Sequence, residues 1–292
     1  MLRNHSRRLS RLGRAALVVT AMSLLALVVV PSAMAEKDFA VFAQCPTANP
    51  EVALCFFAET TSGEFAIGST KVPISQTLTF QGGATQNEET GAETFVGAAN
   101  GETLSKTQLK VPGGLLGVVA PEALPKFLQD IINKLVSEGL DGVTATAELV
   151  GNPSISRVNL LLQEGVALAL PVRIHLSNTF LGKECYIGSK GSPVTFQLTT
   201  GTTSPPKPNK PITGSVGEIE FRDEFQFVII KGNKLVDNSF SVPTASGCGG
   251  LLSLLINPAV NLKLGLPSES GHNTAILEGS LQNATAEVVR KS

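Results

Sequence analysis

The sequence predicts a mainly β protein built from two related β-sheet repeats, sandwich- or barrel-like, each with one packed helix. Three observations lead to this prediction. Most apolar segments are short, rich in β-branched or aromatic residues, and separated by some of the 28 Gly and 17 Pro residues, which is typical of strands joined by turns. Several segments alternate apolar and polar residues, which places one face of a strand against a core. A short pattern also occurs twice along the chain.

Taken in order, the expected strands cover residues 38–43, 52–59, 64–67, 72–80, 103–110, 143–150, 158–163, 167–176, 193–199, 218–230, 239–242 and 274–281. In the stretch 172–176, the apolar residues share one face and Arg173 and His175 share the other. In the stretch 218–229, Ile219, Phe221 and further apolar residues oppose charged ones, so we expect a sheet with one solvated face.

Two segments have a different pattern. Apolar residues in the stretch 124–136 recur at the spacing of an amphipathic helix, and Gly139 can end it. The corresponding stretch 250–264 contains Asn257-Pro258, so a shorter helix with a break is expected there. Both apolar stretches 158–170 and 250–264 could line a cavity for a lipid, although core packing explains them more simply.

The repeated pattern divides the chain. Ile67-Gly68-Ser69 recurs 120 positions later as Ile187-Gly188-Ser189, and matching Pro and Leu residues follow in both copies. The predicted organisation is a signal peptide over residues 1–35, a first β repeat over 36–153 and a second over 154–292. The second repeat carries a Pro-rich loop at residues 204–211, which is expected to be exposed and to serve as a stiff connector or an interaction site.

The first 35 residues have the features of a secretory signal. Five arginines precede an apolar run over residues 15–30, and Ala33-Met34-Ala35 forms an A-x-A cleavage site. The run is shorter than the about 20 apolar residues of a membrane span. Arg7 and Arg8 resemble a twin-arginine signal, but Ser10 stands where that pattern has a bulky apolar residue, which favours the general secretory route. We therefore expect a secreted, extracellular protein, in solution or attached to the cell wall, with no stable membrane span after cleavage.

Charge and composition exclude other classes. The chain has 23 basic and 24 acidic residues, and the predicted leader holds five of the basic ones and none of the acidic ones, so the remainder has a formal charge of −6 (18 − 24). This balance offers no basic field for nucleic acid. With 42% hydrophobic and only 16% charged residues, the chain is not expected to be disordered.

The four cysteines are interpreted as two disulfides, because an even number in an exported chain usually forms bridges. Cys45 and Cys55 lie close together across a Pro- and Asn-containing turn, whereas Cys185 and Cys248 fall in the second half. Of the three pairings, 45–55 and 185–248 are therefore favoured. There is no C-x-x-C pair and no histidine at ligand spacing, so neither a metal nor a cofactor is predicted.

Few residues point to catalysis. No G-x-S-x-G, G-x-x-x-x-G-K-[ST] or H-E-x-x-H motif occurs. After the leader only His175 and His272 remain as histidines. His175 is expected on the polar face of a strand and His272 in a turn. Glu218 and Glu220, with their acidic neighbours up to residue 224, could supply carboxylates for a cation or a reaction, but solvated strand charges beside Arg222 explain them more simply.

Part of the second half resembles a family of secreted actinobacterial proteins whose activity is uncharacterised. The resemblance covers about residues 160–285. It rests on Cys185-Tyr186-Ile187-Gly188-Ser189, Thr202-Thr203-Ser204-Pro205-Pro206 and Gly265-Leu266-Pro267-Ser268. It implies export from an actinobacterium and no catalytic residues.

The sequence thus favours a non-enzymatic binding or structural scaffold outside the cell, whose partner could be a cell-wall component, a lipid or another envelope protein. Two alternatives stay open. One is a secreted hydrolase that uses His175 or His272 with an acid from the 218–224 stretch. The other is a carrier of an apolar ligand, which requires an apolar pocket between sheet and helix.

Overall fold

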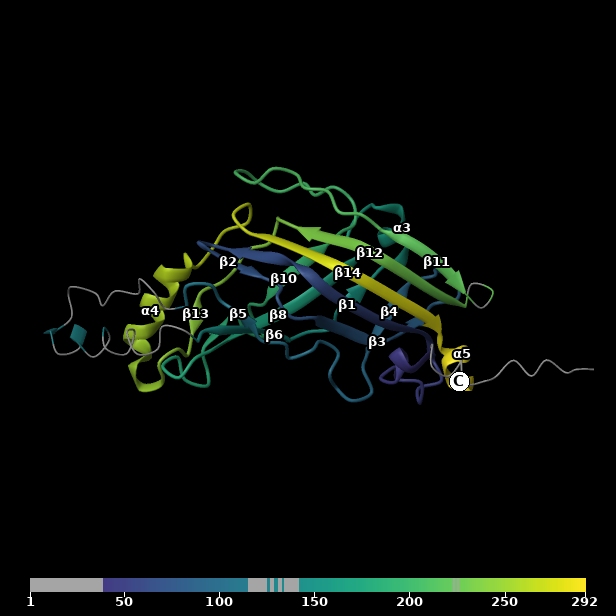
Figure 1. Cartoon of the computed structure of the whole chain (residues 1–292), viewed down its shortest axis with the longest axis horizontal. Helices are drawn as coiled ribbons and strands as arrows, with labels where there is room; N and C mark the ends of the chain where they lie inside the picture. Colours follow the sequence, from purple (N-terminus) through teal and green to yellow (C-terminus); the bar gives the residue numbers. More distant parts are fainter. Residues whose placement is uncertain are drawn as a thin grey trace, which may run out of the picture.

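Two antiparallel sheets, here called sheet A and sheet B, make up most of the described chain and face each other (Figure 1). The structure is a computed structural model that describes residues 39–114, 125–126, 129–130, 133, 142–222, 224 and 226–292. The predicted signal peptide and the apolar residues of the predicted 124–136 helix lie outside the described residues. The mainly β, sandwich-like fold predicted from the sequence is confirmed.

Sheet A has the strand order β11-β12-β14-β1-β3-β4, and β2 also pairs with β1. The most extensive strand pairings in sheet A are those of β14 with β1 and with β12. A strand from the end of the chain therefore lies between an early strand and a late one. The strands are β1 (Val52–Ile67), β2 (Thr70–Pro73), β3 (Leu78–Gln86), β4 (Glu93–Gly97), β11 (Glu218–Arg222), β12 (Phe227–Asp237) and β14 (Thr274–Thr285).

Sheet B has the order β13-β9-β8-β6-β5, and β8 also pairs with β10 and β7. The central strand β8 alternates strictly: Leu170, Val172, Ile174 and Leu176 are buried, and the residues between them are half-buried. The strands are β5 (Leu109–Lys110), β6 (Thr144–Leu149), β7 (Ser154–Ile155), β8 (Leu168–Ser177), β9 (Tyr186–Ile187), β10 (Val194–Leu198) and β13 (Ala245–Ser246).

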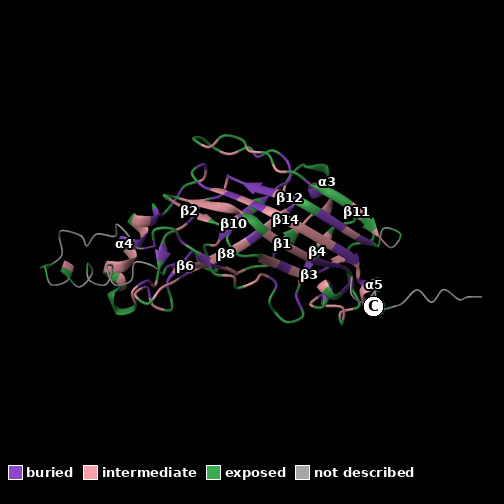
Figure 2. Ribbon diagram, in the orientation of Figure 1, coloured by how far each residue is buried: buried purple, intermediate pink, exposed green. Residues whose placement is uncertain are grey.

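The main core lies between the two sheets. Phe196 of β10 packs against Phe65 of β1, with ring centroids 5.4 Å apart, and against Phe240, at 4.9 Å. Figure 2 shows buried residues within the strands of the sandwich, and along β8 they alternate with half-buried ones, as the period of two requires. One continuous hydrophobic cluster contains residues of both predicted repeats, among them Phe80 and Val172.

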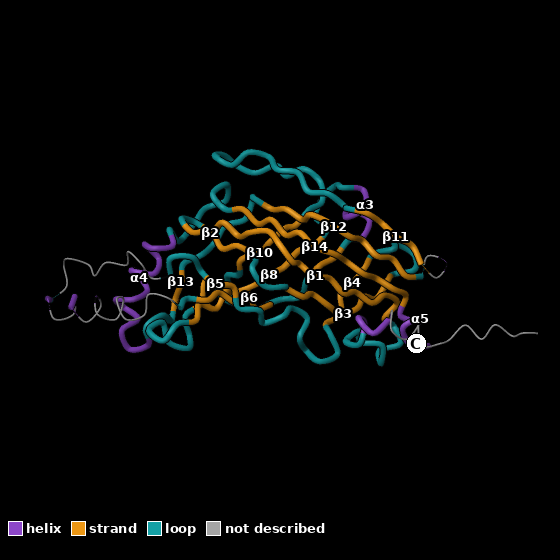
Figure 3. The backbone as a smooth tube through the Cα atoms, in the orientation of Figure 1, coloured by secondary structure: helices purple, strands orange, loops and turns teal. Residues whose placement is uncertain are grey.

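Helices lie at the periphery of the sandwich (Figure 3). The C-terminal helix α5 is tied to the early chain, because the Arg290 guanidinium donates to the carbonyl oxygens of Thr47, Asn49 and Val52. The helical segments are η1 (Ala40–Phe42), α3 (Arg157–Leu162), η3 (Gly250–Leu252), α4 (Ser253–Leu264) and α5 (Ala286–Lys291).

Both predicted repeats contribute strands to both sheets. Residues 36–153 supply β1–β4 to sheet A and β5 and β6 to sheet B, and the remaining strands come from residues 154–292. In the repeated pattern, Gly68 and Gly188 both adopt positive φ after a strand, at 54° and 77°. Beyond this turn the copies differ, because Leu78 begins β3 whereas Leu198 ends β10. The duplication stays a prediction.

Two segments predicted as strands are helical. Residues 38–43 contain η1, because helical spacing lets Phe39 and Phe42 both pack on Phe227, at 5.3 and 5.6 Å between ring centroids. Of residues 158–163, the first five belong to α3 instead of a strand, and Gln163 is the C-cap of that helix. A short apolar run does not distinguish a strand from a helix by its periodicity, and here the cap at Ser156 decides.

Other predicted strands have different bounds. The stretches 52–59 and 64–67 form one strand, β1, which passes through an irregularity between Thr60 and Ser62. The stretch 218–230 is two strands, β11 and β12, in an antiparallel hairpin whose turn includes Glu224 at φ 52°. The stretch 72–80 is likewise divided between β2 and β3.

Two further stretches form much less strand than expected. In 103–110 only β5 and a bridge at Leu104 form, since the Ser105 side chain accepts the Thr79 backbone N–H and so replaces part of a ladder. In 239–242 only Val242 makes a bridge. The strands expected over 143–150, 167–176, 193–199 and 274–281 occur as β6, β8, β10 and the first part of β14.

The predicted break at Asn257-Pro258 does not occur: α4 continues through Pro258 as one helix. Side chains on both sides of the proline attach the helix to neighbouring backbone. Asn257 accepts the Cys248 N–H at 2.8 Å, and Asn261 both accepts from and donates to the Ala245 backbone, at 2.7 and 3.0 Å. These bonds offset the backbone hydrogen bond that proline cannot make.

Both favoured disulfides are present. Cys45 bonds Cys55 and Cys185 bonds Cys248, and no free cysteine occurs among the described residues. The first bridge closes a short loop beside the end of sheet A, and the second joins chain positions 63 residues apart. Such bonds persist in an oxidising environment.

Candidate functional site

An apolar groove of about 390 Å³ lies between α3 and the strands of sheet A. This volume is within the range of roughly 300–1,000 Å³ that small-molecule sites occupy. Strands β11, β12 and β14 and the β3–β4 hairpin line one side, and β7 and α3 line the other. The apolar lining consists of Ala92, Ile155, Val158, Leu160, Leu161, Ile219, Phe221, Val228, Ile230 and Leu281.

Hydrogen bonds and a close contact to its backbone hold helix α3 in place along this groove. The Ser156 hydroxyl accepts the Asn159 N–H at 3.2 Å and caps the first turn. The Thr200 hydroxyl donates to the Leu160 carbonyl at 2.6 Å. At the other end, Gly201 approaches so closely that a Cβ there would lie 2.0 Å from the Gln163 carbonyl oxygen. The short helix is thus held by the segment that follows β10.

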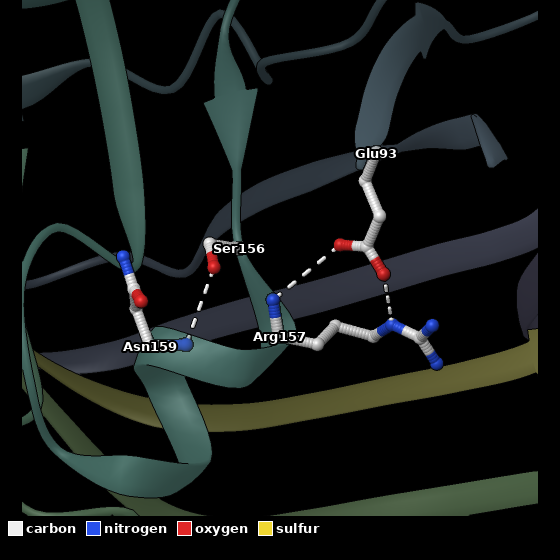
Figure 4. A network of polar contacts seen from close by, with 4 residues as sticks. All are labelled: Glu93, Ser156, Arg157 and Asn159. Carbon is white, nitrogen blue, oxygen red and sulfur yellow. Dashed lines mark hydrogen bonds and ion pairs between the residues drawn. The ribbon is translucent and has the colours of Figure 1, made fainter. Parts of the chain in front are cut away.

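An ion pair joins the two sides of the groove (Figure 4). Glu93, the first residue of β4, accepts from the Nε–H of Arg157 and from its backbone N–H. The Glu93 side chain is only 7% exposed and that of Arg157 is 30% exposed. The carboxylate is therefore nearly desolvated, and the guanidinium beside it supplies the compensating charge.

Several apolar side chains around the groove are left in contact with solvent. Phe221 is 54% exposed and Leu161 46% exposed, and Val158 and Ile219 are exposed as well. All four line the groove. The prediction that Ile219 and Phe221 belong to a buried face is therefore wrong: both side chains are exposed, and their strand lies at the edge of sheet A. Contiguous exposed apolar residues of this kind mark binding surfaces.

A second apolar cavity, of about 80 Å³, lies between the two sheets, bordered by residues such as Phe80, Leu170 and Leu235. It is far below the volume of a typical ligand site. These residues belong to the main hydrophobic core. The groove beside α3 is therefore the better candidate for binding.

His175 lies on the outer face of sheet B. The His175 ring stacks on the Tyr186 ring, with 4.7 Å between centroids. The Arg173 guanidinium lies 4.0 Å from the centroid of the Tyr186 ring and pairs with Glu148 at 2.8 Å. The His175 Nε2 atom is buried and has no hydrogen-bond partner among the described residues. No carboxylate there contacts the imidazole to form a catalytic pair.

The acidic strand residues are placed elsewhere. Glu218 and Glu220 lie on β11 of sheet A, and Glu220 bonds Arg222 at 2.6 Å and Lys231 at 2.9 Å. These two cations, Lys231 first, lower the pKa of the Glu220 carboxyl. Asp223 lies outside the described residues, and Glu224 is exposed. The simpler expectation, solvated charges next to Arg222, agrees with this geometry.

His272 is exposed in the turn before β14. Glu220 pairs with Ile229 of β12, which in turn pairs with Gln282. Gln282 lies eight residues along β14 from its first residue, or about 26 Å at the usual rise of a strand. The structure therefore brings neither histidine together with Glu218 or Glu220.

The Pro-rich loop is held at its centre. Residues 204–211 form no strand or helix and are mostly exposed, and the connection that contains them extends along one border of the sandwich (Figure 1). Asn209 donates to the carbonyls of Asn238 and Asn273, and Asn238 donates to the Lys210 carbonyl. These bonds anchor the loop to the chain around the start of β14.

Sequence reasoning missed the Glu93–Arg157 pair, because 64 positions separate the two residues and nothing local connects them. The apolar stretch that contains Val158 and Leu161 was considered as a cavity lining, and it does line the groove. The stretch 250–264 contributes no lining residue there.

No three His, Cys, Asp or Glu side chains of the described residues gather so as to hold a metal ion. Over the same part of the chain, no helix combines the length and the apolar character that a membrane crossing requires. No protein-family model, curated protein or solved structure matches this chain.

Proposed function

We propose that this is an exported, non-enzymatic protein that binds an apolar ligand in the groove beside α3. The observation that carries the proposal is the groove itself, with an apolar lining and four exposed apolar side chains around it. Burying these side chains under a ligand would remove apolar surface from water, which favours binding.

Export is supported by the signal-like first 35 residues and by the two disulfides. An extracellular or cell-wall location would place the groove next to lipids and other envelope components. The hydrolase alternative gains no support, because His175, His272 and the β11 carboxylates lie apart.

A fluorescent apolar probe tests the proposal. 1-N-phenylnaphthylamine should show saturable fluorescence enhancement with the disulfide-bonded protein. Leu161→Glu should weaken its affinity by about tenfold or more, because binding would desolvate an unpaired carboxylate. Leu162→Glu is the matched control: Leu162 is exposed on the same helix but does not line the groove, so its affinity should equal that of the wild type.

Equal probe binding by the wild type and the Leu161→Glu variant would refute the groove as the site. A folded wild-type protein that shows no saturable enhancement would refute the proposed function.

A further inference from the structure

The groove has an apolar end and a polar end. Ile219 and Phe221 belong to β11, at one edge of sheet A, whereas Gln86 and Glu93 face each other across β3 and β4, at the opposite edge. With neighbouring strands about 4.8 Å apart, four steps separate β11 from β3, or about 19 Å. The lining therefore changes from apolar to polar along the direction that crosses the strands.

The polar end is rich in hydrogen-bond donors but has no net charge. Glu93 and Arg157 are the two charged side chains that line the groove, and they compensate each other. Glu93 occupies only the Nε side of the guanidinium, and Figure 4 shows the two terminal nitrogens beyond it. Neither terminal nitrogen has a partner among the described residues, so both can donate to a ligand.

This arrangement discriminates between head groups. A carboxylate bound to Arg157 would also approach the Glu93 carboxylate, which repels it and is poorly screened because it is nearly buried. An uncharged head with hydroxyl or ester oxygens would accept the same hydrogen bonds without that repulsion. The apolar end would take the alkyl chain.

We propose that the groove binds a neutral single-chain amphiphile of the monoacylglycerol type, with its oxygen-bearing head at Arg157 and its alkyl chain directed towards β11. This inference rests on the proposed function and specifies its ligand class. It requires that head-group charge, and not only chain length, determines affinity.

Competition at pH 8 tests it. Monolaurin and laurate share one alkyl chain, and each is titrated against bound 1-N-phenylnaphthylamine below its aggregation concentration. Monolaurin should displace the probe from the wild type at lower concentration than laurate. In Glu93→Gln the groove gains a net positive charge, so laurate affinity should rise about tenfold while monolaurin affinity changes by less than about twofold.

Glu89→Gln is the matched control, because Glu89 is an exposed carboxylate of the same hairpin that does not line the groove. It should leave both affinities unchanged. A second variant, Glu93→Gln combined with Arg157→Gln, keeps the groove uncharged but removes the guanidinium. It should bind the probe as the wild type does and bind monolaurin about fivefold more weakly, because the head loses charge-assisted hydrogen bonds.

The outcomes separate the two proposals. If the probe does not bind, the proposed function fails. If the probe binds but the wild type prefers laurate, or if Glu93→Gln does not raise laurate affinity, the groove stands and the neutral head group is refuted. If Glu93→Gln does not fold, unchanged monolaurin affinity in the double variant would refute the role of Arg157.

Discussion

The Glu93 carboxylate receives the side-chain and backbone N–H groups of Arg157, and this pair connects β4 of sheet A to the first residue of α3. The Glu93 side chain is 7% exposed, which is less than any other side chain in the ion pairs of the described residues. The contact therefore has two roles: it orients the helix that borders the groove, and it sets the charge of the groove.

Removing the guanidinium should destabilise the fold. Arg157→Ala leaves the buried Glu93 carboxylate without its charged partner, and we expect the free energy of unfolding to fall by about 2 kcal/mol. Arg222→Ala serves as the comparison, because it breaks the exposed pair with Glu220 and should have a much smaller effect. Urea unfolding measures both variants, and equal losses would show that Glu93 is not effectively buried.

The two disulfides should contribute unequally. Cys185–Cys248 closes a loop with a sequence separation of 63 and Cys45–Cys55 one of 10. In the chain-entropy account, the longer loop restricts the unfolded chain more, giving about 4 kcal/mol against about 3 kcal/mol. Guanidinium unfolding of the double alanine variant at each bridge measures the difference. A larger loss at Cys45–Cys55 would contradict this account.

Asn273 should be among the most sensitive polar positions. It is fully buried; its Oδ1 accepts the Gly68 N–H at 3.0 Å, and its Nδ2 donates to the carbonyls of Phe240 and Glu269, each at 3.0 Å. Asn273→Ala leaves these groups unpaired, which should lower the free energy of unfolding by about 3 kcal/mol. The exposed Asn152→Ala should unfold as the wild type does, and thermal unfolding of both variants checks the contrast.

Asp237 should make stability depend on pH. It is buried at the end of β12, and desolvation raises the pKa of its carboxyl above the ordinary value of 3.8 despite hydrogen bonds from the backbone N–H groups of Gln197 and Ser239. The folded state therefore binds the proton more tightly than the unfolded state, so the contribution of Asp237 falls as pH rises from about 3.8 through the raised pKa.

Urea unfolding of the wild type and of Asp237→Asn across this pH range isolates the effect. The free energy of unfolding of the wild type minus that of the variant should decrease with rising pH and level off above the raised pKa. A difference that increases with pH would show that the pKa of Asp237 is lowered by folding.

The sequence was most informative where one local pattern has one physical interpretation. The alternation of Val172, Ile174 and Leu176 predicted β8, because a strand with one buried face requires it. The positions of the four cysteines predicted both bridges. The apolar run that became α3 failed as a prediction, because a short apolar run fits strand and helix equally well. Ser156 as a cap residue was the local signal that could have identified the helix.

The candidate site depends on contacts between distant parts of the chain, which no local pattern encodes. Glu93 begins β4 of sheet A and Arg157 begins α3, and Ile219 joins them only because β11 pairs with β12 and β12 with β14. The segment between β11 and β12 contains no Gly, Pro or Asn, and Asp223 is its one common turn residue, so the turn signal in the sequence was weak. The histidines could be found in the sequence, but their separation from the β11 carboxylates could not.

The central claim is that the groove beside α3 binds an apolar chain, and anomalous diffraction from a brominated ligand tests it most directly. The ligand is a monoacylglycerol whose alkyl chain carries bromine at its terminal carbon, crystallised with the disulfide-bonded protein. We predict an anomalous peak in the groove near Ile219 and Val228, with the glycerol oxygens at Arg157. A bound ligand whose bromine lies outside the residues that line this groove would contradict the account.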